Sequence, residues 1–308
     1  MSSGAELLDE LRPVAFRVAY RMLGSVSEAE DVVQEALLRL HRTLEAGEPV
    51  ESPRAFVATV ATRLAIDELR SARARRESYV GEWLPEPVVT DPAEGPERRA
   101  ELADSLSFAF LVVLESLSPE QRAAFLLHDV FDYDYGEVAA IVGTSEQNTR
   151  QLAARARRHV QSRRPRYEAS RERRDELARR FFAAAEDGDL AALEELLAED
   201  VTLHGDGGGK VPALARALHG RSRVARTLLA WMRQGARIGG AGIRRVEVNG
   251  QAGALLLAPD GGLIGVMVLA IADGRVHAVN SVVNPDKLRH LGPVADLGEL
   301  LGGRGGRR

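Results

Sequence analysis

The stretch Tyr135–Val160, YGEVAAIVGTSEQNTRQLAARARRHV, sets the framework for the whole chain. Apolar residues at helical spacing predict one helix before Gly143 and a second helix after it, and the glycine predicts a tight turn. The apolar positions are Val138, Ile141 and Val142 on the first helix and Thr149, Leu152, Ala156 and Val160 on the second. Two helices joined in this way have the layout of a helix-turn-helix.

The second of these helices carries a polar face opposite its apolar one. Side chains on such a face can read base edges in a major groove, while arginines neutralise phosphates. We expect a DNA-contacting face formed by Gln147, Asn148, Arg150, Gln151, Ala154, Arg155 and Arg158, with Arg157 as a further phosphate ligand. Loose patterns of this kind are common, so a solvated helical hairpin inside an all-α domain is the alternative.

Length and composition narrow the class of protein. The 308 residues suffice for two or three domains, and a hydrophobic content of 45% is that of ordinary globular domains. The chain has no cysteine, which excludes disulfides and a thiolate zinc site. The sequence has no apolar run of membrane-spanning length and its first residues are polar and acidic, so we expect a cytoplasmic protein without a membrane partner.

The charge distribution indicates a domain boundary. The formal charge is only −4, which argues against a uniformly basic surface. Residues 150–174 nevertheless contain ten Arg and two Glu, whereas residues 175–200 contain nine acidic residues and two Arg. We expect one domain to end and another to begin near this reversal.

Three amphipathic helices are expected in the first part of the chain, over residues 7–23, 27–42 and 53–76. Ser25 or Ser27 can cap the second helix, and Pro53 suits the first position of the third. Opposite its buried stripe, the second helix presents a polar face with one leucine, which is either a plain solvated face or a protein-docking face. The residues of this face are Asp31, Gln34, Glu35 and Leu38.

The third helix carries a ridge of basic residues interleaved with Thr and Ile. Charge runs are usually solvated, but this combination suits a nucleic-acid backbone better than open water. The ridge consists of Thr59, Arg63, Ile66, Arg70 and Arg73, and Arg75 and Arg76 extend its charge.

Three successive motifs carry a family resemblance. They are RMLGSVSEAEDVVQEALLRL (residues 21–40), SPRAFVATVATRLAIDELRSARAR (52–75) and LESLSPEQRAAFLLHDVFDYDYGEVAAIVGTSEQNTRQLAARARRHV (114–160), and their order resembles an extracytoplasmic-function (ECF) sigma factor of bacterial RNA polymerase. The chain departs from the family pattern at Phe56-Val57, where Trp-Leu is frequent, and at Thr149, where Val is usual.

The resemblance implies a role for each of these surfaces. The face Asp31–Leu38 would dock on the clamp of the polymerase β′ subunit. The ridge of the third helix would bind the −10 promoter element, with the loop Glu45–Ser52 near the base that is flipped out as the duplex melts. The face of the helix-turn-helix would bind the −35 element.

The segment Glu77–Glu97 is acidic and rich in proline. It holds four Pro, six acidic residues and no basic one, so it predicts an extended connector and not a helix. Trp83 and Leu84 do not suit a mere spacer, because a tryptophan in a solvated linker tends to find a partner surface. The motif WLPEP, Trp83–Pro87, is therefore a candidate docking peptide. In the family this connector runs through the polymerase toward its active centre.

The last part of the chain predicts an α+β domain. The pattern is a long helix, a short helix and a strand over residues 171–206, a further helix over 220–236, and then four strands. Asn249-Gly250, Asp260-Gly261 and Asp273-Gly274 separate the last strands and predict an antiparallel meander. A last helix within residues 291–301 and a disordered tail at 302–308 complete the expectation.

This part resembles the SnoaL-like polyketide-cyclase fold, a cystatin-like cone of curved sheet around a helix. Some sigma factors bear such an extension, and the motifs DGGGK (Asp206–Lys210), NPDKL (Asn284–Leu288) and WLPEP resemble those of that subgroup. The resemblance implies an interdomain, regulatory role for Trp83, Leu84, Pro85, Asp206, Lys210, Asn284, Pro285, Asp286 and Lys287.

Catalysis by the extension is not expected. His204 with Asp206 can be proposed as an acid–base pair, but a fold does not confer activity and a lone His beside a Gly-rich turn is more often structural. Val211 stands where a phosphate-binding loop needs Ser or Thr after its Lys. We therefore expect no catalytic residue, cofactor or metal.

The sequence thus predicts a multidomain sigma factor. Its parts are an all-α region 2 at residues 5–76, the linker at 77–100, an all-α helix-turn-helix region 4 at 101–165 and the SnoaL-like domain at 171–301. We expect a monomer when free, which binds core RNA polymerase and promoter DNA and is modulated in cis by its C-terminal domain. The alternative is a SnoaL-type isomerase or cyclase, or a ligand-sensing domain, fused to a DNA-binding module. Whether a small ligand occupies the C-terminal pocket stays open.

Overall fold

The computed structural model describes residues 4–77, 79–90, 107–163, 170–237 and 242–302. Its contacts divide the chain into two compact units, Met1–Ser78 with Asp104–Arg164 and Tyr79–Ala103 with Pro165–Arg308. The first part of the linker thus belongs to the same unit as the C-terminal domain. The linker residues 91–100, the start of region 4 at 101–106 and the tail at 303–308 lie outside the described residues.

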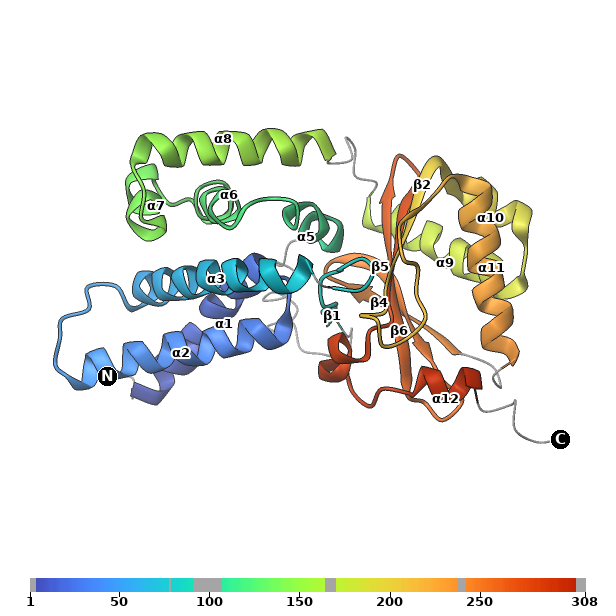
Figure 1. The fold of residues 1–308 in the computed structure, drawn as a ribbon, viewed down its shortest axis with the longest axis horizontal. Helices are drawn as coiled ribbons and strands as arrows, with labels where there is room; N and C mark the ends of the chain where they lie inside the picture. The colour runs from blue at the N-terminus through green and yellow to red at the C-terminus, as the bar shows by residue number, and fades with distance from the viewer. Residues whose placement is uncertain (1–3, 78, 91–106, 164–169, 238–241, 303–308) are drawn as a thin grey trace. The chain divides into compact units, whose positions relative to one another are not determined.

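The first unit begins with three long helices: α1 (Gly4–Leu23), α2 (Val26–Glu45) and α3 (Pro53–Glu77), which pack on one another (Figure 1). Gly24 at φ 67° ends α1, and the Ser25 hydroxyl accepts the amide hydrogen of Glu28 to cap α2. The predicted core stripe of α2 is buried at Val32, Val33, Ala36 and Leu40. The three helices expected from the sequence are confirmed.

The described part of the predicted region 4, residues 107–163, contains α5 (Phe108–Leu114), α6 (Pro119–Phe125), the π-helical turn η1 (Leu126–Val130), α7 (Tyr135–Val142) and the longer α8 (Glu146–Arg163). Asp134 and Glu137 form a reciprocal capping box at the start of α7. Gly143 closes α7 in the left-handed conformation at φ 76°, which only glycine adopts at little cost. Val138, Ile141 and Ala153 pack between α7 and α8, so the predicted helix-turn-helix is confirmed.

The second unit is built on a seven-stranded sheet of order β1-β4-β5-β6-β7-β2-β3. Its strands are β1 (Val89–Thr90), β2 (Leu197–Asp206), β3 (Leu218–His219), β4 (Gly242–Val248), β5 (Gln251–Leu257), β6 (Leu263–Ala272) and β7 (Arg275–Val282). Strands β4 to β7 form the expected antiparallel meander. The sheet as a whole is mixed, because β2 pairs with β7 in parallel.

Helices α9 (Arg171–Asp187), α10 (Leu190–Leu196) and α11 (Arg221–Arg237) lie on one side of this sheet (Figure 1). The core of the unit is formed where their apolar faces meet the strands, with Phe181 and Phe182 of α9 in edge-to-face contact. The NPDKL motif forms the 3₁₀ turn η2 (Pro285–Lys287), followed by η3 (Arg289–Leu291) and α12 (Leu297–Gly302).

The linker also contributes a short strand to the sheet of the second unit. Val89 and Thr90 pair with Val248 and Glu247 at the edge of the sheet, which the sequence reading as an extended spacer did not foresee. None of the helices in the described part of the chain is long and apolar enough to cross a membrane.

Candidate functional site

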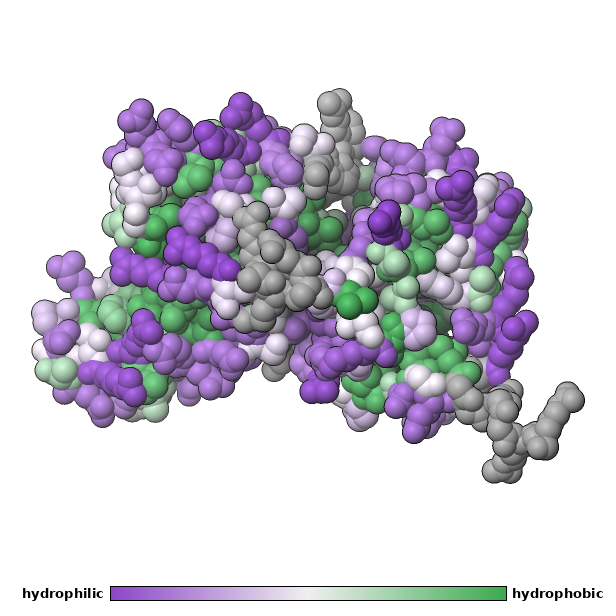
Figure 2. All heavy atoms as spheres, viewed as in Figure 1, coloured by the Kyte–Doolittle hydropathy of each residue, from purple (hydrophilic) through white to green (hydrophobic). Residues whose placement is uncertain are grey.

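The polar face of α8 is exposed, as the helical wheel predicts. Gln147, Asn148, Arg150, Gln151, Arg155 and Arg158 are all exposed, and hydrophilic side chains cover much of α8 in Figure 2. Arg150 is held from within the motif, because it pairs with Glu146 and its guanidinium lies 4.5 Å from the centre of the Tyr135 ring. Arg157 differs from the others, because its guanidinium forms an ion pair with Asp129, 2.7 Å from a carboxylate oxygen.

The docking face expected on α2 is also at the surface. Asp31 and Gln34 are exposed, and Leu38 keeps 40% of its surface in solvent. Glu35 is half-buried and accepts a hydrogen bond of 2.7 Å from Arg39 one turn later. A leucine so exposed within a polar face is consistent with a contact surface but does not define one.

The ridge on α3 is only partly a free surface. Arg63 donates to the carbonyl oxygens of Ala140 at 3.0 Å and Ile141 at 3.3 Å, in the last turn of α7. Arg70 donates to Glu120 of α6 at 2.9 Å. Burial opposes the ionisation of Glu120, but its own backbone amide and Arg70 outweigh burial and keep the pKa of this carboxyl below its usual value.

One member of the ridge was misplaced by the sequence pattern. Ile66 is only 3% exposed, so its side chain is not available at the surface of α3. The reason is that α3 packs against α6 and α7 as well as against α1 and α2, so that more than one line of this helix is covered. Thr59 is half-buried, and the side chain of Arg73 lies outside the described part of the chain.

The strongest constellation of buried polar groups lies in the second unit, around Asp206. Its carboxylate is fully buried and accepts four hydrogen bonds from residues that the structure describes. The donors are the Tyr79 hydroxyl at 2.5 Å, the Leu84 amide at 2.9 Å, the Gly208 amide at 3.0 Å and the Lys287 ammonium at 2.7 Å. Two of the four donors belong to the linker, so this carboxylate joins the linker to the C-terminal fold.

Lys287 completes the site from the NPDKL turn. Its side chain is 7% exposed, and its ammonium donates to Asp206 and to the carbonyl oxygen of Leu84. The same nitrogen lies 3.8 Å from the centre of the Trp83 ring, within the range of a cation–π interaction. The burial of a charge is tolerated here because carboxylate, carbonyl and aromatic ring all offset its lost hydration.

Asn284 and the glycines of DGGGK form part of the site on the C-terminal domain where the linker peptide Tyr79–Pro87 docks, which we call the seat of the linker. The Asn284 side chain caps the η2 turn through the Asp286 amide at 3.1 Å and donates to the Tyr79 hydroxyl at 2.9 Å. A Cβ atom at Gly208 would lie 2.3 Å from the Asn284 amide nitrogen, and Gly208 has φ +61°. Glycine is therefore required at this position both by conformation and by the close approach.

The remaining residues of the two motifs lie at the rim. Lys210 forms an ion pair with Asp286, and both side chains are about half exposed. Pro285 is half-buried at the start of η2, and Pro85 is buried in the linker. The structure thus brings the interdomain residues expected in WLPEP, DGGGK and NPDKL into one neighbourhood.

His204 contacts the linker at Glu82. Its Nδ1 atom lies 3.2 Å from both carboxylate oxygens of Glu82, and its Nε2 atom lies 3.1 Å from the Thr202 hydroxyl. Burial raises the pKa of Glu82, but the hydrogen bond and attraction of His204, together with the Gly205 and Ala217 amides, bring it below its usual value. An acid–base pair of His204 and Asp206 is therefore not supported.

Sequence reasoning missed several anchors of the linker. Tyr79 and Glu82 were not singled out, nor was His290, whose Nε2 atom lies 2.8 Å from the carbonyl oxygen of Pro87. Val88 exchanges two hydrogen bonds with Asn249, at 3.0 Å and 2.9 Å. The available signal was the position of Tyr79 and Glu82 beside Trp83 in a segment otherwise suited to solvent. Among the described residues, no cluster of three or more acidic or histidine side chains is suited to a metal ion.

Comparison with known proteins places the two units in one class, that of multidomain transcription initiation factors. The Sigma-70 region 2 family matches residues 7–75, Sigma-70 region 4 matches 107–160 and the SnoaL-like domain family matches 178–279. ECF RNA polymerase sigma factor SigJ of Mycobacterium tuberculosis is 41% identical over 292 residues, which cover 91% of each chain. A probable ECF sigma factor of the same species, SigI, is 31% identical over 91% of this chain and 92% of its own.

A solved structure agrees with the sequence relatives. The crystal structure of M. tuberculosis SigJ matches with a TM-score of 0.75 and 37% identity, over 93% of this chain and 98% of that one. The chain belongs to the family of ECF RNA polymerase sigma factors. It therefore binds core RNA polymerase and promoter DNA and directs promoter-specific initiation, and as a sigma factor it is not an enzyme.

Proposed function

We propose that the SnoaL-like domain controls transcription initiation by holding the linker peptide Tyr79–Pro87 in its own fold. The observation that carries the proposal is the buried Asp206–Lys287 pair, both of whose members bond to Leu84 of the linker. In the docked WLPEP segment Trp83 is half-buried and the four residues after it are buried, so these four cannot at the same time contact polymerase. Release of the linker is therefore expected to raise promoter-directed transcription.

Membership in the family supports an assignment of the contact surfaces. We propose that Asp31, Gln34, Glu35 and Leu38 contact the β′ clamp of core polymerase in the cytoplasm. Thr59, Arg63, Arg70 and Arg73 would serve the −10 element, and the exposed polar face of α8 the −35 element. Free chain would be a monomer, since the linker finds its partners within its own chain, and light scattering measures this directly.

A second restraint acts within the sigma regions. Arg63 and Arg70 of the −10 surface are engaged by α7 and α6 of region 4. An arginine that donates to the carbonyl oxygens of Ala140 and Ile141 is not free to contact a phosphate. We propose that α3 separates from region 4 before the −10 element binds, and that core polymerase supplies the energy for this separation.

Run-off transcription with purified core polymerase tests the proposal. Leu84→Asp places a charge at a position that is 2% exposed and expels the linker from its seat. Val80→Asp is the matched control, because Val80 lies in the same peptide but is 66% exposed. The proposal expects several-fold more transcript with Leu84→Asp than with the wild-type chain or the control. Equal or lower yield would refute it, provided that Trp83 emission in a Trp231→Phe background shows that the linker is released.

A further inference from the structure

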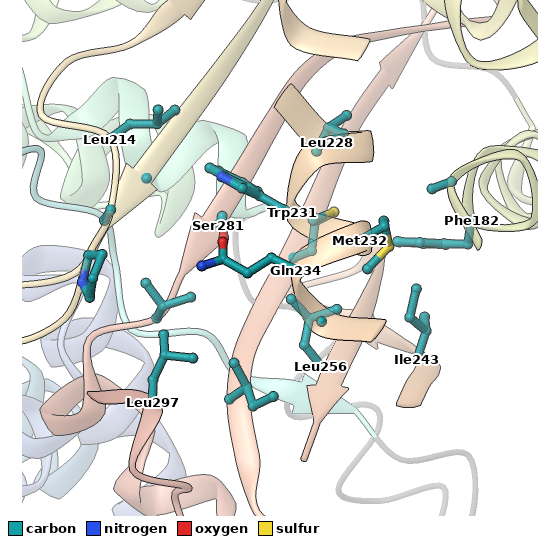
Figure 3. A pocket seen from close by; sticks show the side chains of 18 of the residues that line it. Phe182, Leu214, Leu228, Trp231, Met232, Gln234, Ile243, Leu256, Ser281 and Leu297 are labelled. Atoms are coloured by element: carbon teal, nitrogen blue, oxygen red, sulfur yellow. The ribbon is translucent and has the colours of Figure 1, made fainter. Parts of the chain in front are cut away.

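The C-terminal domain contains a cavity, partly open to solvent, whose described lining includes no residue of the linker. Its volume is about 300 Å³, at the lower end of the range found for small-molecule sites. Helix α11 forms one wall with Leu228, Trp231 and Met232, and the sheet forms another with Leu256 and Met267. Figure 3 shows the side chains of Trp231, Met232 and Leu256 gathered around this space.

The lining is apolar apart from a few groups placed on one side. Among the described residues that line the cavity, none carries a charge. Ser281 of β7 is only 3% exposed, and no hydrogen bond of its hydroxyl is found within the described part of the chain. Gln234 extends its amide into the cavity on the side of Ser281, as Figure 3 shows. A ligand that suits this lining is uncharged and has one hydrogen-bonding group.

Water is a poor occupant of such a space. Water molecules that lie against this lining find few polar partners on the protein, chiefly the Ser281 hydroxyl and the Gln234 amide. Replacement of this water by an apolar molecule is favourable, provided that the molecule satisfies the polar side.

The cavity shares a wall with the seat of the linker. Gly205 and Val283 line the cavity, and each directly precedes an anchor of the linker, Asp206 and Asn284 respectively. Leu214 also lines it and packs tightly on Gly205, where a Cβ atom would lie 3.1 Å from the Leu214 amide nitrogen. The DGGGK turn lies between these two residues, so its position fixes part of the cavity wall.

We propose that this cavity binds a neutral, mainly apolar small molecule with one hydrogen-bonding group, and that its occupancy strengthens docking of the linker. The ligand would contact the cavity wall in the conformation that the wall has when the linker is docked. A ligand that binds one conformation better shifts the equilibrium toward it, and the effect is reciprocal. The coupling rests on the proposed function of the linker, whereas the binding site stands without it.

The neutral fluorophore N-phenyl-1-naphthylamine, titrated into the full-length chain, tests the site. Its emission is expected to rise in a saturable manner. Met232→Trp or Leu256→Trp, which fill the cavity from half-buried positions, should abolish the saturable signal. Ala230→Trp adds the same bulk at an exposed position of α11 and should leave it unchanged. Absence of saturable binding to the wild-type chain, or equal binding to both filled variants, would overturn the site.

The same titration tests the coupling. Leu84→Asp should weaken the affinity for the fluorophore several-fold, whereas Val80→Asp should not. Unchanged affinity with Leu84→Asp would overturn the coupling while leaving the site in place. Transcription by Leu84→Asp is a separate readout, so a failure here and a failure of the proposed function are distinguishable.

Discussion

Lys287 and Asp206 form an ion pair of 2.7 Å in which the lysine side chain is 7% exposed and the aspartate is fully buried. The pair is separated by 81 positions in the sequence, and Leu84 bonds to both members. A buried pair is weak evidence for stability as such, because its desolvation offsets much of its attraction. The pair matters here because of where it lies: the linker supplies a hydrogen-bond partner to each of its two charged groups.

Removal of one member of this pair should lower the free energy of unfolding far more than removal of both. Lys287→Met leaves the buried Asp206 carboxylate without its counter-ion, which is expected to cost about 3–5 kcal/mol. In the double variant Asp206→Asn with Lys287→Met, much of this loss should be regained. The urea midpoint of the tryptophan emission change measures both effects, because Trp83 and Trp231 both lie in the second unit. Lys210→Met is the control, because the Lys210–Asp286 pair is about half exposed and surface pairs contribute little. Additive losses in the double variant would contradict the coupling.

Gly208→Ala should disturb the seat of the linker more than its backbone strain explains. The new methyl group would meet Asn284 at 2.3 Å, in addition to the strain of φ +61°. Gly250→Ala is the matched control, with φ +69° and nothing within 4 Å of its Cβ position. The strain alone costs about 1–2 kcal/mol. Urea unfolding should show that loss for Gly250→Ala and a clearly larger one for Gly208→Ala, and equal losses would contradict the close approach.

The contact of Glu82 with His204 should make docking sensitive to acid. The pKa of Glu82 in the folded chain lies below its ordinary value of 4.5. Its stabilising contribution is therefore fully present above pH 4.5 and is lost as the pH falls through the lowered pKa. In a Trp231→Phe chain, Trp83 is the one remaining tryptophan, so emission followed from pH 6 downward should report release of the linker, and Glu82→Gln should remove this component. An identical acid profile for Glu82→Gln would show that another group governs the release.

Two arginines of α8 should differ in their effect on DNA binding. If Arg150 contacts a base edge of the −35 element, then Arg150→Ala should cost about 1–3 kcal/mol on the preferred promoter and relax selectivity. Arg158→Ala should weaken binding evenly across sequences and reduce the salt slope by about one. Holoenzyme binding to promoter fragments at several salt concentrations separates the two. The same change in selectivity for both variants would contradict the assignment.

Local patterns predicted the elements of this fold, because periodicity and turn chemistry act over few residues. Gly143 ends α7, Pro53 starts α3, and Asn249-Gly250 joins β4 to β5. The parallel pairing of β2 with β7 and the addition of β1 to the sheet were not predictable in this way, since they join distant segments. Ile66 shows the same limit, because a helical wheel cannot tell how many sides of α3 are covered.

Most residues of the candidate site were predicted from the sequence, but the hydrogen bonds between them were not. Trp83, Asp206 and Lys287 came from motif resemblance, and the anomaly of a tryptophan in an acidic linker pointed to a partner surface. The sequence does not show that one carboxylate receives Tyr79, Leu84 and Lys287 together, since these residues lie 81 to 127 positions from Asp206. Only its position near Trp83 marked Tyr79.

A reversible lock on the linker tests the central claim most directly. The chain has no native cysteine, and a Cβ atom at Gly209 would lie 2.9 Å from that of Val80, so Val80→Cys with Gly209→Cys can form a single disulfide after a small shift. Run-off transcription from one promoter is then compared before and after reduction, with each single variant and the wild-type chain as controls. The account predicts several-fold more transcript after reduction of the double variant alone. Equal transcription by the locked and reduced chains would contradict it.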